Sequence, residues 1–240
     1  MNIILPSAGA GSRFARAGYK LPKPMIDVMG KPMIQVATEY LNFPDARFIF
    51  IVQKNHNEQY GLEQFLKTIK PGCEVVEVSG LTEGAACTVL AARHLIDDDQ
   101  DLIIANCDQY VEFDCAGFMQ EIISCDAVGG MVTFKAQDRD PKWSYAKLDD
   151  AGYICEVAEK KAISDIATSG IYHFRTGKSF LEAADAMIKK NIRVNNEFYI
   201  CPIYNEIVNR GKIINKFCTS MHGLGTPEDL AFFIKTKGIV

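Results

Sequence analysis

Several features that would assign a protein to a common class are missing from this chain of 240 residues. No apolar run approaches the roughly 20 residues that a membrane helix needs, and the glycine-rich start lacks the charged leader of a signal peptide. The eight cysteines form no C-x-x-C pair, and the four histidines have no metal-ligand spacing. We therefore expect a cytoplasmic protein with reduced thiols, without disulfides, a zinc centre or a membrane partner.

Acidic residues are absent from the first 26 positions, although the whole chain carries a net charge of −4. This segment contains four cations, Arg13, Arg16, Lys20 and Lys23, so −8 is left for residues 27–240. The sequence pI near 5.6 argues against a general nucleic-acid partner. The local +4 instead predicts a pocket for a small anion near the N-terminus.

Short apolar strands alternate with helices in the first half of the chain. The predicted strands cover 2–6, 47–53, 73–78 and 102–106, and the predicted helices cover 58–69, 85–95 and a segment from about 32. This alternation is typical of an α/β fold with a doubly wound, mostly parallel sheet.

The pattern changes after residue 126, where strands follow one another. We predict antiparallel strands over 128–134, 145–149 and 153–157, a strand over 171–174, and helices over 179–190, 198–210 and from 227. Residues 150–152 are expected to form a turn between two of the strands. No linker, repeat or low-complexity segment interrupts the sequence, so we expect one domain over residues 1–240 with a small antiparallel β insertion in its second half.

A glycine-rich loop, residues 9–14, follows the first predicted strand and has two interpretations. Glycines allow the backbone to approach phosphate oxygens, as in a Rossmann dinucleotide site. That fingerprint requires a third glycine where Phe14 stands, followed by a long helix, which Pro22 and Pro24 prevent. The nearby cations favour a triphosphate over NAD. A solvated basic loop is the plainer alternative.

One acidic residue stands where a ligand crevice is expected. Asp108 lies just beyond the strand predicted over 102–106, and the carboxyl ends of parallel strands face ligands. Phosphoryl chemistry with Mg²⁺ uses one or two carboxylates together with phosphate oxygens. A turn residue that caps a loop is the alternative interpretation of Asp108.

The stretch LPSAGAGSRFARAGYKLPKPMIDV, residues 5–28, and GKPMI, residues 30–34, contain a G-x-G-[ST]-R loop, a K-P segment and a G-K-P-[ML]-[IL] helix start. With these motifs the chain resembles the sugar-phosphate nucleotidyltransferase family, which has a Rossmann-like, GT-A-type fold. The resemblance implies an enzyme, as a monomer or homodimer, that moves NMP from an NTP to a phosphorylated acceptor and releases pyrophosphate. The implied acceptor is a sugar 1-phosphate, and the implied cofactor is Mg²⁺.

The same resemblance implies a nucleotide site made by Ala8, Gly9, Gly11, Ser12, Arg13, Lys23, Glu83 and Gly84. Arg13 and Lys23 would hold the triphosphate and the departing pyrophosphate, and Asp108 would bind the metal. Gly84 would let the base approach the backbone. From the residues alone, 82–86 is equally well explained as a helix N-terminus capped by Thr82.

An acceptor site is also implied. Trp143 and Tyr145 would line its wall, Glu159 would bind hydroxyl groups, Lys160 would bind the phosphate, and Gly170 would allow close approach. The implied catalytic set is thus Arg13, Lys23, Asp108 and Lys160. A buried core tryptophan and a solvated Glu–Lys pair are the plainer alternatives, since neighbours on a strand face opposite ways.

One position departs from the family pattern and leaves the chemistry partly open. Relatives read D-x-G-T-P, with a second metal ligand at the Asp, whereas this chain has Gly223 there. Glu197 could supply another oxygen ligand, or one carboxylate could suffice.

The base and the acceptor also stay open. NCDQY, PKWSYAK, EKK and NNEFY resemble a branch associated with bacterial surface-polysaccharide synthesis, some members of which are CTP-dependent cytidylyltransferases for phosphocholine or phosphoglutamine. An NAD(P)-dependent oxidoreductase and a catalytically silent nucleotide-binding protein are the alternatives from other classes.

Overall fold

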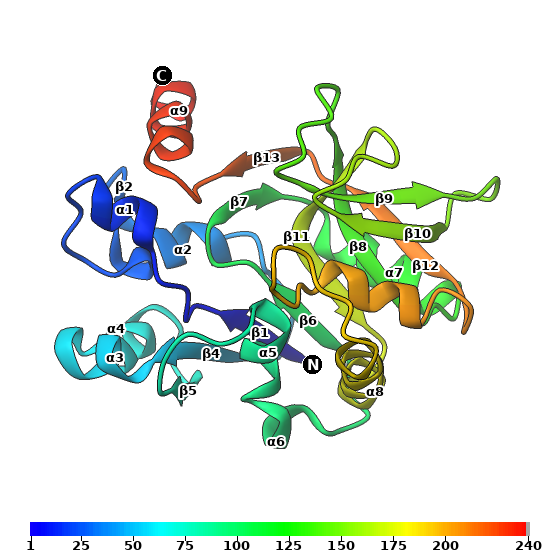
Figure 1. Cartoon of the computed structure of the whole chain (residues 1–240), viewed down its shortest axis with the longest axis horizontal. Coiled ribbons are helices and arrows are strands. Elements are labelled where there is room, and N and C mark those ends of the chain that lie inside the picture. Colours follow the sequence, from blue (N-terminus) through cyan, green and yellow to red (C-terminus); the bar gives the residue numbers. More distant parts are fainter. Residues whose placement is uncertain (239–240) are drawn as a thin grey trace.

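The computed structural model describes residues 1–238, and its centre is a nine-stranded mixed sheet (Figure 1). The strand order is β10-β9-β11-β6-β1-β4-β5, and β8 pairs with both β11 and β12. The strands of this sheet are β1 (Asn2–Pro6), β4 (Arg47–Gln53), β5 (Glu74–Val78), β6 (Leu102–Ala105), β8 (Gly129–Lys135), β9 (Ser144–Leu148), β10 (Ile154–Glu159), β11 (Ile166–Phe174) and β12 (Ile213–Phe217).

Two small antiparallel pairs lie outside the sheet, β2 (Asp27–Val28) with β3 (Lys31–Pro32) and β7 (Gln109–Glu112) with β13 (Ser220–Gly223). The α-helices are α1 (Ser12–Arg16), α2 (Met33–Thr38), α3 (Lys54–Tyr60), α4 (Leu62–Ile69), α5 (Ala85–Leu90), α6 (Arg93–Ile96), α7 (Cys115–Ser124), α8 (Gly177–Lys189) and α9 (Pro227–Lys237). Two 3-10 segments are η1 (Lys23–Met25) and η2 (Cys201–Glu206). Within residues 1–238, none of these helices is long and apolar enough to span a membrane.

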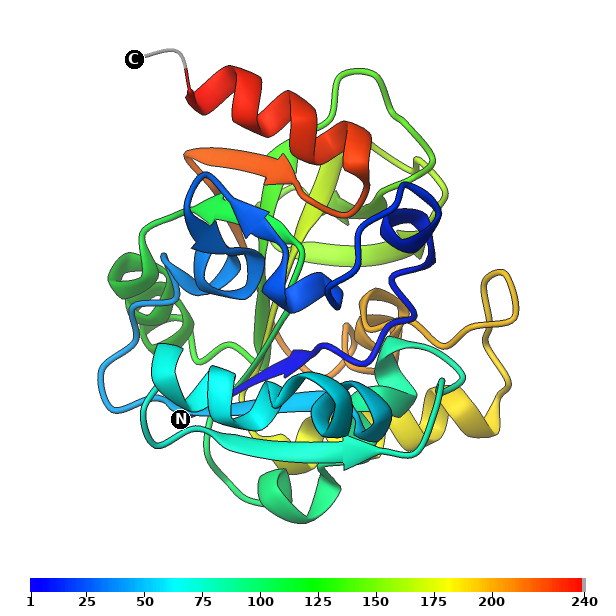
Figure 2. The ribbon, with the colours of Figure 1, turned by 90° about the vertical axis from the view of Figure 1, so that its left-hand side faces the viewer.

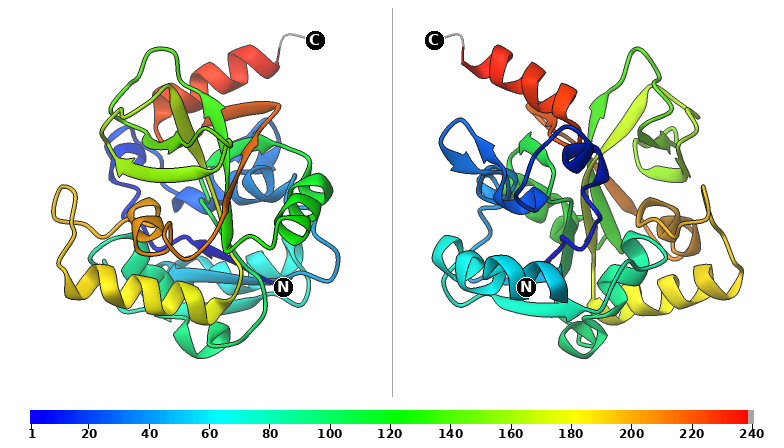
Figure 3. Two further views of the ribbon diagram at one scale, coloured as in Figure 1. Left: turned by 90° about the vertical axis from the view of Figure 1, so that its right-hand side faces the viewer. Right: turned by 60° about the vertical axis from the view of Figure 1, so that its left-hand side comes forward.

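The first half confirms the predicted doubly wound sheet. β1 pairs in parallel with both β4 and β6, and β4 pairs in parallel with β5. Side chains alternate between two buried clusters, because successive residues on a strand point to opposite faces. Ile4 packs with residues of α5 and α8 in one cluster, whereas Ile3 and Leu5 pack with residues of α2, α4 and α7 in the other. Helices therefore cover both faces of the sheet (Figure 3).

The antiparallel strands predicted for the second half are present and join the same sheet. β11 pairs antiparallel with β6 and β8, and β9 pairs antiparallel with β10. The predicted turn between β9 and β10 is present, with Gly152 at a φ of 86°. At one end of the molecule α9 packs on β13, and α3 and α4 lie at the other end (Figure 2). The loop after β1 lies between them.

Three predicted helices differ from the observed elements. The helix over 58–69 is two helices, α3 and α4, because Gly61 takes the left-handed conformation with a φ of 64°. The helix over 85–95 is divided into α5 and α6. The segment 198–210 forms only the short η2, since its residues turn to follow the end of β10 and the base of α8. The final helix is as predicted, with Thr226 as its N-cap.

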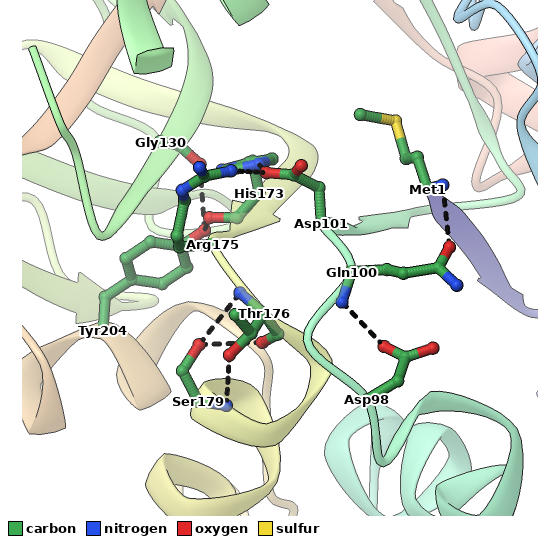
Figure 4. Close-up of polar contacts among 10 residues, drawn as sticks. All are labelled: Met1, Asp98, Gln100, Asp101, Gly130, His173, Arg175, Thr176, Ser179 and Tyr204. Atoms are coloured by element: carbon green, nitrogen blue, oxygen red, sulfur yellow. Dashed lines mark hydrogen bonds and ion pairs between the residues drawn. The ribbon is translucent and has the colours of Figure 1, made fainter.

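A polar cluster around one buried histidine lies at the start of β6. His173 is fully buried on β11, and its Nε2 lies 2.8 Å from Oδ1 of Asp101 (Figure 4). Arg175 donates to the same carboxylate oxygen at 2.9 Å. The next residue, Thr176, is the N-cap of α8 and forms a capping box with Ser179. The cluster ties β11 to the loop before β6.

Acid is expected to destabilise the fold through this histidine. Burial lowers the pKa of His173 below its ordinary 6.5, although the Asp101 carboxylate opposes the shift. The folded protein then binds fewer protons than the unfolded chain. The free energy of unfolding should therefore fall as the pH drops below 6.5, by up to about 1.4 kcal/mol per pH unit for this one group.

Urea denaturation of the wild type and of His173→Gln, from about pH 5 to about pH 8, measures this contribution. The variant should lose less stability on acidification than the wild type does. His94→Gln, at an exposed position of α6, is the control and should keep the wild-type pH dependence. Equal pH dependence of His173→Gln and the wild type would contradict the assignment.

Candidate active site

A polar cavity of about 380 Å³ opens at the carboxyl end of β6. Its wall contains six of the residues singled out by the resemblance, which come from five separate segments: Arg13, Asp108, Trp143, Glu159, Lys160 and Gly170. It also contains residues that were not expected there: Asn106, Gln109, Lys142, Thr168, Tyr199 and Asp229. The cavity therefore brings Arg13 of the predicted nucleotide site and Asp108 together with four residues of the predicted acceptor site.

The loop after β1 brings one cation, Arg13, to the wall of this cavity. The Ala8 carbonyl is held by Gln53 Nε2 at 2.8 Å, which fixes the start of the loop. Gly11 takes the left-handed conformation, with a φ of 60°, and begins a helix of only five residues, as the prolines downstream predict. Gly9 and Ser12 are exposed, and Arg13 reaches the cavity wall. Exposed N–H groups beside a cation suit an anionic ligand.

Lys23 and Asp108 form an ion pair between this loop and the end of β6. Lys23 Nζ lies 2.5 Å from Asp108 Oδ2, and both side chains keep some exposure, 19% and 26%. Burial alone would lower the pKa of Lys23, but the Asp108 carboxylate raises it above its ordinary value. The backbone N–H of Leu224 donates to the Asp108 carbonyl at 2.8 Å, so the segment after β13 closes over this pair.

The donor set around Asp108 suits a hard cation that a ligand helps to hold. Within the described chain, residues 1–238, no three His, Cys, Asp or Glu side chains are grouped as a metal site. One carboxylate with room for phosphate oxygens is an arrangement that Mg²⁺ commonly uses. Glu197 is exposed and lies beside Tyr199, whose pKa its carboxylate helps to raise after burial. Glu197 itself is not part of the cavity wall, although its neighbour Tyr199 lies on the same wall as Asp108.

Glu159 and Lys160 both face the cavity, although neighbours on a regular strand point to opposite faces. The reason is the backbone of Lys160, which has a φ of 54° just after β10 ends. Left-handed backbone is uncommon for a residue with a side chain, and such conformations cluster at functional sites. Lys160 Nζ lies 2.5 Å from the Tyr199 hydroxyl. Glu159 accepts a hydrogen bond from Ser144, and burial raises its pKa.

The packing around Gly170 gives a reason for a glycine at this position that is separate from the expected approach of an acceptor. It lies at an irregularity in the pairing of β11 with β8, with a φ of 79°. A Cβ there would lie 2.1 Å from Gln109 Oε1 and 2.4 Å from Asn106 Nδ2. The glycine therefore lets these two amide side chains cross the strand and reach the cavity wall.

Several predicted site residues are not part of the cavity wall, among them Tyr145, Glu83 and Gly84. Tyr145 was expected to line the acceptor site, but it is fully buried and its hydroxyl donates to the Asp140 carbonyl at 2.8 Å. Glu83 pairs with Arg193 at 2.5 Å. Gly84 gives room to the backbone of Phe198, since a Cβ would lie 2.4 Å from the Phe198 carbonyl oxygen.

Thr82 does not cap α5, because the residue at the N-cap is Gly84, with a φ of 123°. The Thr82 hydroxyl instead donates to the Gly84 carbonyl at 2.9 Å.

Among the residues that sequence reasoning missed, Asn106 and Gln109 flank Asp108 at the same strand end and could have been found from that position. Lys142 and Asp229 come from a loop and from α9, and no local motif points to them.

Comparison with known proteins gives similarities over most of the chain. A family model described as nucleotidyl transferase matches residues 1–230. The bifunctional protein GlmU of Methanocaldococcus jannaschii is 28% identical over 178 residues, which cover 72% of this chain and 40% of that protein. The matched chain thus spans well under half of that relative's length.

Solved structures resemble this one along their whole length. The nucleoside-diphosphate-sugar pyrophosphorylase from Vibrio cholerae has a TM-score of 0.83 at 25% identity, covering 97% of this chain and 99% of that chain. A putative glucose-1-phosphate thymidylyltransferase from Bacillus anthracis has a TM-score of 0.79 at 20% identity, covering 100% and 95%. At 20% identity, the similarity to the second structure supports the fold alone.

Proposed function

This chain belongs to the nucleotidyl transferase family, and on that premise we propose that it moves NMP from an NTP to a phosphorylated small-molecule acceptor and releases pyrophosphate. The observation that carries the proposal is the contact of Lys23 with Asp108 at the edge of a cavity whose other wall holds Lys160. Two groups of charge, one at the glycine loop and one at the end of β10, suit two phosphate-bearing substrates that meet between them.

The reaction follows from where these charges lie. A phosphate oxygen of the acceptor, held by Lys160, attacks the α-phosphorus of the NTP. The new P–O bond forms as the bond to the β-phosphate breaks, and pyrophosphate leaves toward Arg13 and Lys23. A phosphate monoester is already nucleophilic, so the step requires no general base. Catalysis is then positioning and neutralisation of charge by fixed cations.

Mg²⁺ is part of this proposal, and Asp108 is the residue that would hold it together with phosphate oxygens. When bound, the ion would supply further neutralisation of the triphosphate charge. Lys23, which is paired with Asp108 here, would then be free to turn toward the leaving phosphates. A single protein carboxylate is consistent with Gly223, at the position where the family pattern would place a second one.

For the acceptor we propose a sugar 1-phosphate, used in making a surface-polysaccharide precursor. The similarity to GlmU and to a nucleoside-diphosphate-sugar pyrophosphorylase supports a sugar, and the resemblance of the NCDQY and NNEFY motifs supports the surface-polysaccharide role. CTP with a non-sugar phosphate, such as phosphocholine or phosphoglutamine, is the alternative pair of substrates.

Pyrophosphate release from a panel of substrates tests the proposal. Each of ATP, CTP, GTP, UTP and dTTP is combined with Mg²⁺ and with sugar 1-phosphates, phosphocholine or phosphoglutamine. Release that requires both an NTP and an acceptor is the expected result. NTP binding without release from any acceptor would instead identify a silent nucleotide-binding protein.

A further inference from the structure

Tyr199 contacts Lys160 with both its hydroxyl group and its ring. Lys160 Nζ donates to the Tyr199 hydroxyl at 2.5 Å and lies 4.5 Å from the centre of the Tyr199 ring. Both residues line the polar cavity at the carboxyl end of β6. The ammonium group of Lys160 is therefore held from one side by a residue that itself faces the ligand space.

This contact directs the ammonium group without neutralising it. An ammonium group has three N–H donors, so one contact with a hydroxyl leaves two for the oxygens of a phosphate. Burial raises the pKa of Tyr199, and the Glu197 carboxylate raises it further, so the hydroxyl stays neutral. A carboxylate in direct contact with Lys160 would instead offset the positive charge that attracts a phosphate.

Lys160 needs such a contact because its backbone is fixed but its side chain is long. The left-handed φ of 54° and the hydrogen bond from the Lys160 N–H to the Trp143 carbonyl, at 3.1 Å, place the Cα atom. The side chain beyond it has several rotatable bonds, and fixing them when a ligand binds costs entropy. A contact that orders the side chain in advance lowers that cost.

The backbone that carries Tyr199 is fixed on both sides. Phe198 and Ile200 are only 2% and 3% exposed, so the two residues that flank Tyr199 lie in the core. The Phe198 N–H donates to the Glu83 carbonyl at 2.7 Å, and the Ala86 N–H donates to the Phe198 carbonyl at 3.0 Å. These two bonds attach the segment to the start of α5.

A second attachment lies in the loop before Tyr199, which joins α8 to η2 (Figure 2). Arg193 pairs with Glu83 at 2.5 Å, and its guanidinium group lies 3.9 Å from the centre of the Phe198 ring. None of these contacts involves Lys160. The position of Tyr199 is therefore set independently of the lysine that it holds, as is needed for a residue that orients another.

We propose that Tyr199 is a positioning residue for the acceptor, which holds the Lys160 ammonium group toward the place where the acceptor phosphate binds. This proposal rests on the proposed function, in which Lys160 binds that phosphate. Tyr199 acts through Lys160 and not through a contact of its own with the acceptor. Its hydroxyl therefore matters to acceptor binding only while Lys160 is present.

Removing the Tyr199 hydroxyl tests this proposal. Tyr199→Phe keeps the ring and should raise the KM for the acceptor about fivefold, the size of effect expected for the loss of one hydrogen bond. The KM for the NTP should keep its wild-type value, because the substitution acts on the acceptor side alone. Initial rates of pyrophosphate release are measured with the preferred NTP and acceptor, each varied in turn.

The same substitution in the Lys160→Met variant separates positioning from direct contact. Because Tyr199 acts through Lys160, Tyr199→Phe should leave the already raised acceptor KM of Lys160→Met unchanged. A direct contact of Tyr199 with the acceptor, or a general defect in the fold, would make the two effects multiply. Multiplied effects in the double variant would therefore overturn the proposal.

Tyr153→Phe is the matched control. Tyr153 also lies under a lysine, with Lys212 Nζ 5.3 Å from the centre of its ring, but it is not part of the cavity wall. Its acceptor KM should equal that of the wild type. A wild-type acceptor KM in Tyr199→Phe, or equal increases in the two tyrosine variants, would overturn the positioning role while leaving the proposed function intact. Absence of pyrophosphate release from every combination of NTP and acceptor would overturn the proposed function, and the role of Tyr199 with it.

Discussion

The Asp108→Asn substitution is expected to lower pyrophosphate release about 1000-fold, the upper range for loss of one preorganised electrostatic group. Asparagine keeps the size of the side chain but removes the charge that pairs with Lys23 and that would hold Mg²⁺. The protein should stay folded, because both partners of this pair are partly exposed. The rate is measured with saturating NTP and acceptor over a range of Mg²⁺ concentrations.

Asp185→Asn is the matched control for this substitution. It removes the same charge from an exposed carboxylate on α8, which pairs with Arg93 and is not part of the cavity wall. Its rate should equal that of the wild type. Mn²⁺ binding in the presence of NTP, followed by electron paramagnetic resonance, should weaken in Asp108→Asn alone. Wild-type turnover by Asp108→Asn would remove this residue from the mechanism.

The Lys160→Met substitution is expected to raise the KM for the acceptor about 30-fold while leaving NTP affinity unchanged. This size corresponds to about 2 kcal/mol, a typical value for a hydrogen bond to a charged group. Lys160 Nζ lies beside the Tyr199 hydroxyl in the part of the cavity that we propose for the acceptor, so its loss should affect one substrate. Initial rates with varied acceptor, and NTP titration by calorimetry, measure the two effects.

Lys161→Met provides a control one residue away. Lys161 is exposed and carries the same charge as its neighbour, but it is not in the left-handed conformation that turns Lys160 into the cavity. Its acceptor KM should stay within about twofold of the wild-type value, as expected for a surface charge. Equal increases in both variants would mean that overall charge, and not the position of Lys160, controls acceptor binding.

The parallel half of the fold could be predicted because its strands are short, continuous and apolar. The bounds of β1 and β4 agree with the prediction, as buried parallel strands carry a strong local signal. The antiparallel strands were recognised, but their union with the parallel strands through β11 was not. That union depends on pairing between segments far apart in sequence. The break at Gly61 was likewise missed, since isolated glycines occur within helices as well as between them.

The part of the site that short sequence motifs define was predicted from the sequence. Arg13, Asp108 and Lys160 follow from short motifs, and the structure brings them to one cavity. The roles of two glycines could not be derived from the sequence. Gly84 makes room for the backbone of Phe198, and Gly170 makes room for the amide side chains after β6. Only the folded chain brings these neighbours close to the glycines.

The position of a radioactive label tests the central claim most directly. The protein is incubated with its preferred acceptor and with NTP labelled either at the α-phosphorus or at the γ-phosphorus, and the products are separated. Attack of the acceptor phosphate at the α-phosphorus predicts that the α label enters the nucleotide-linked product and the γ label enters pyrophosphate. Recovery of the γ label in the acceptor, or in orthophosphate, would contradict nucleotidyl transfer.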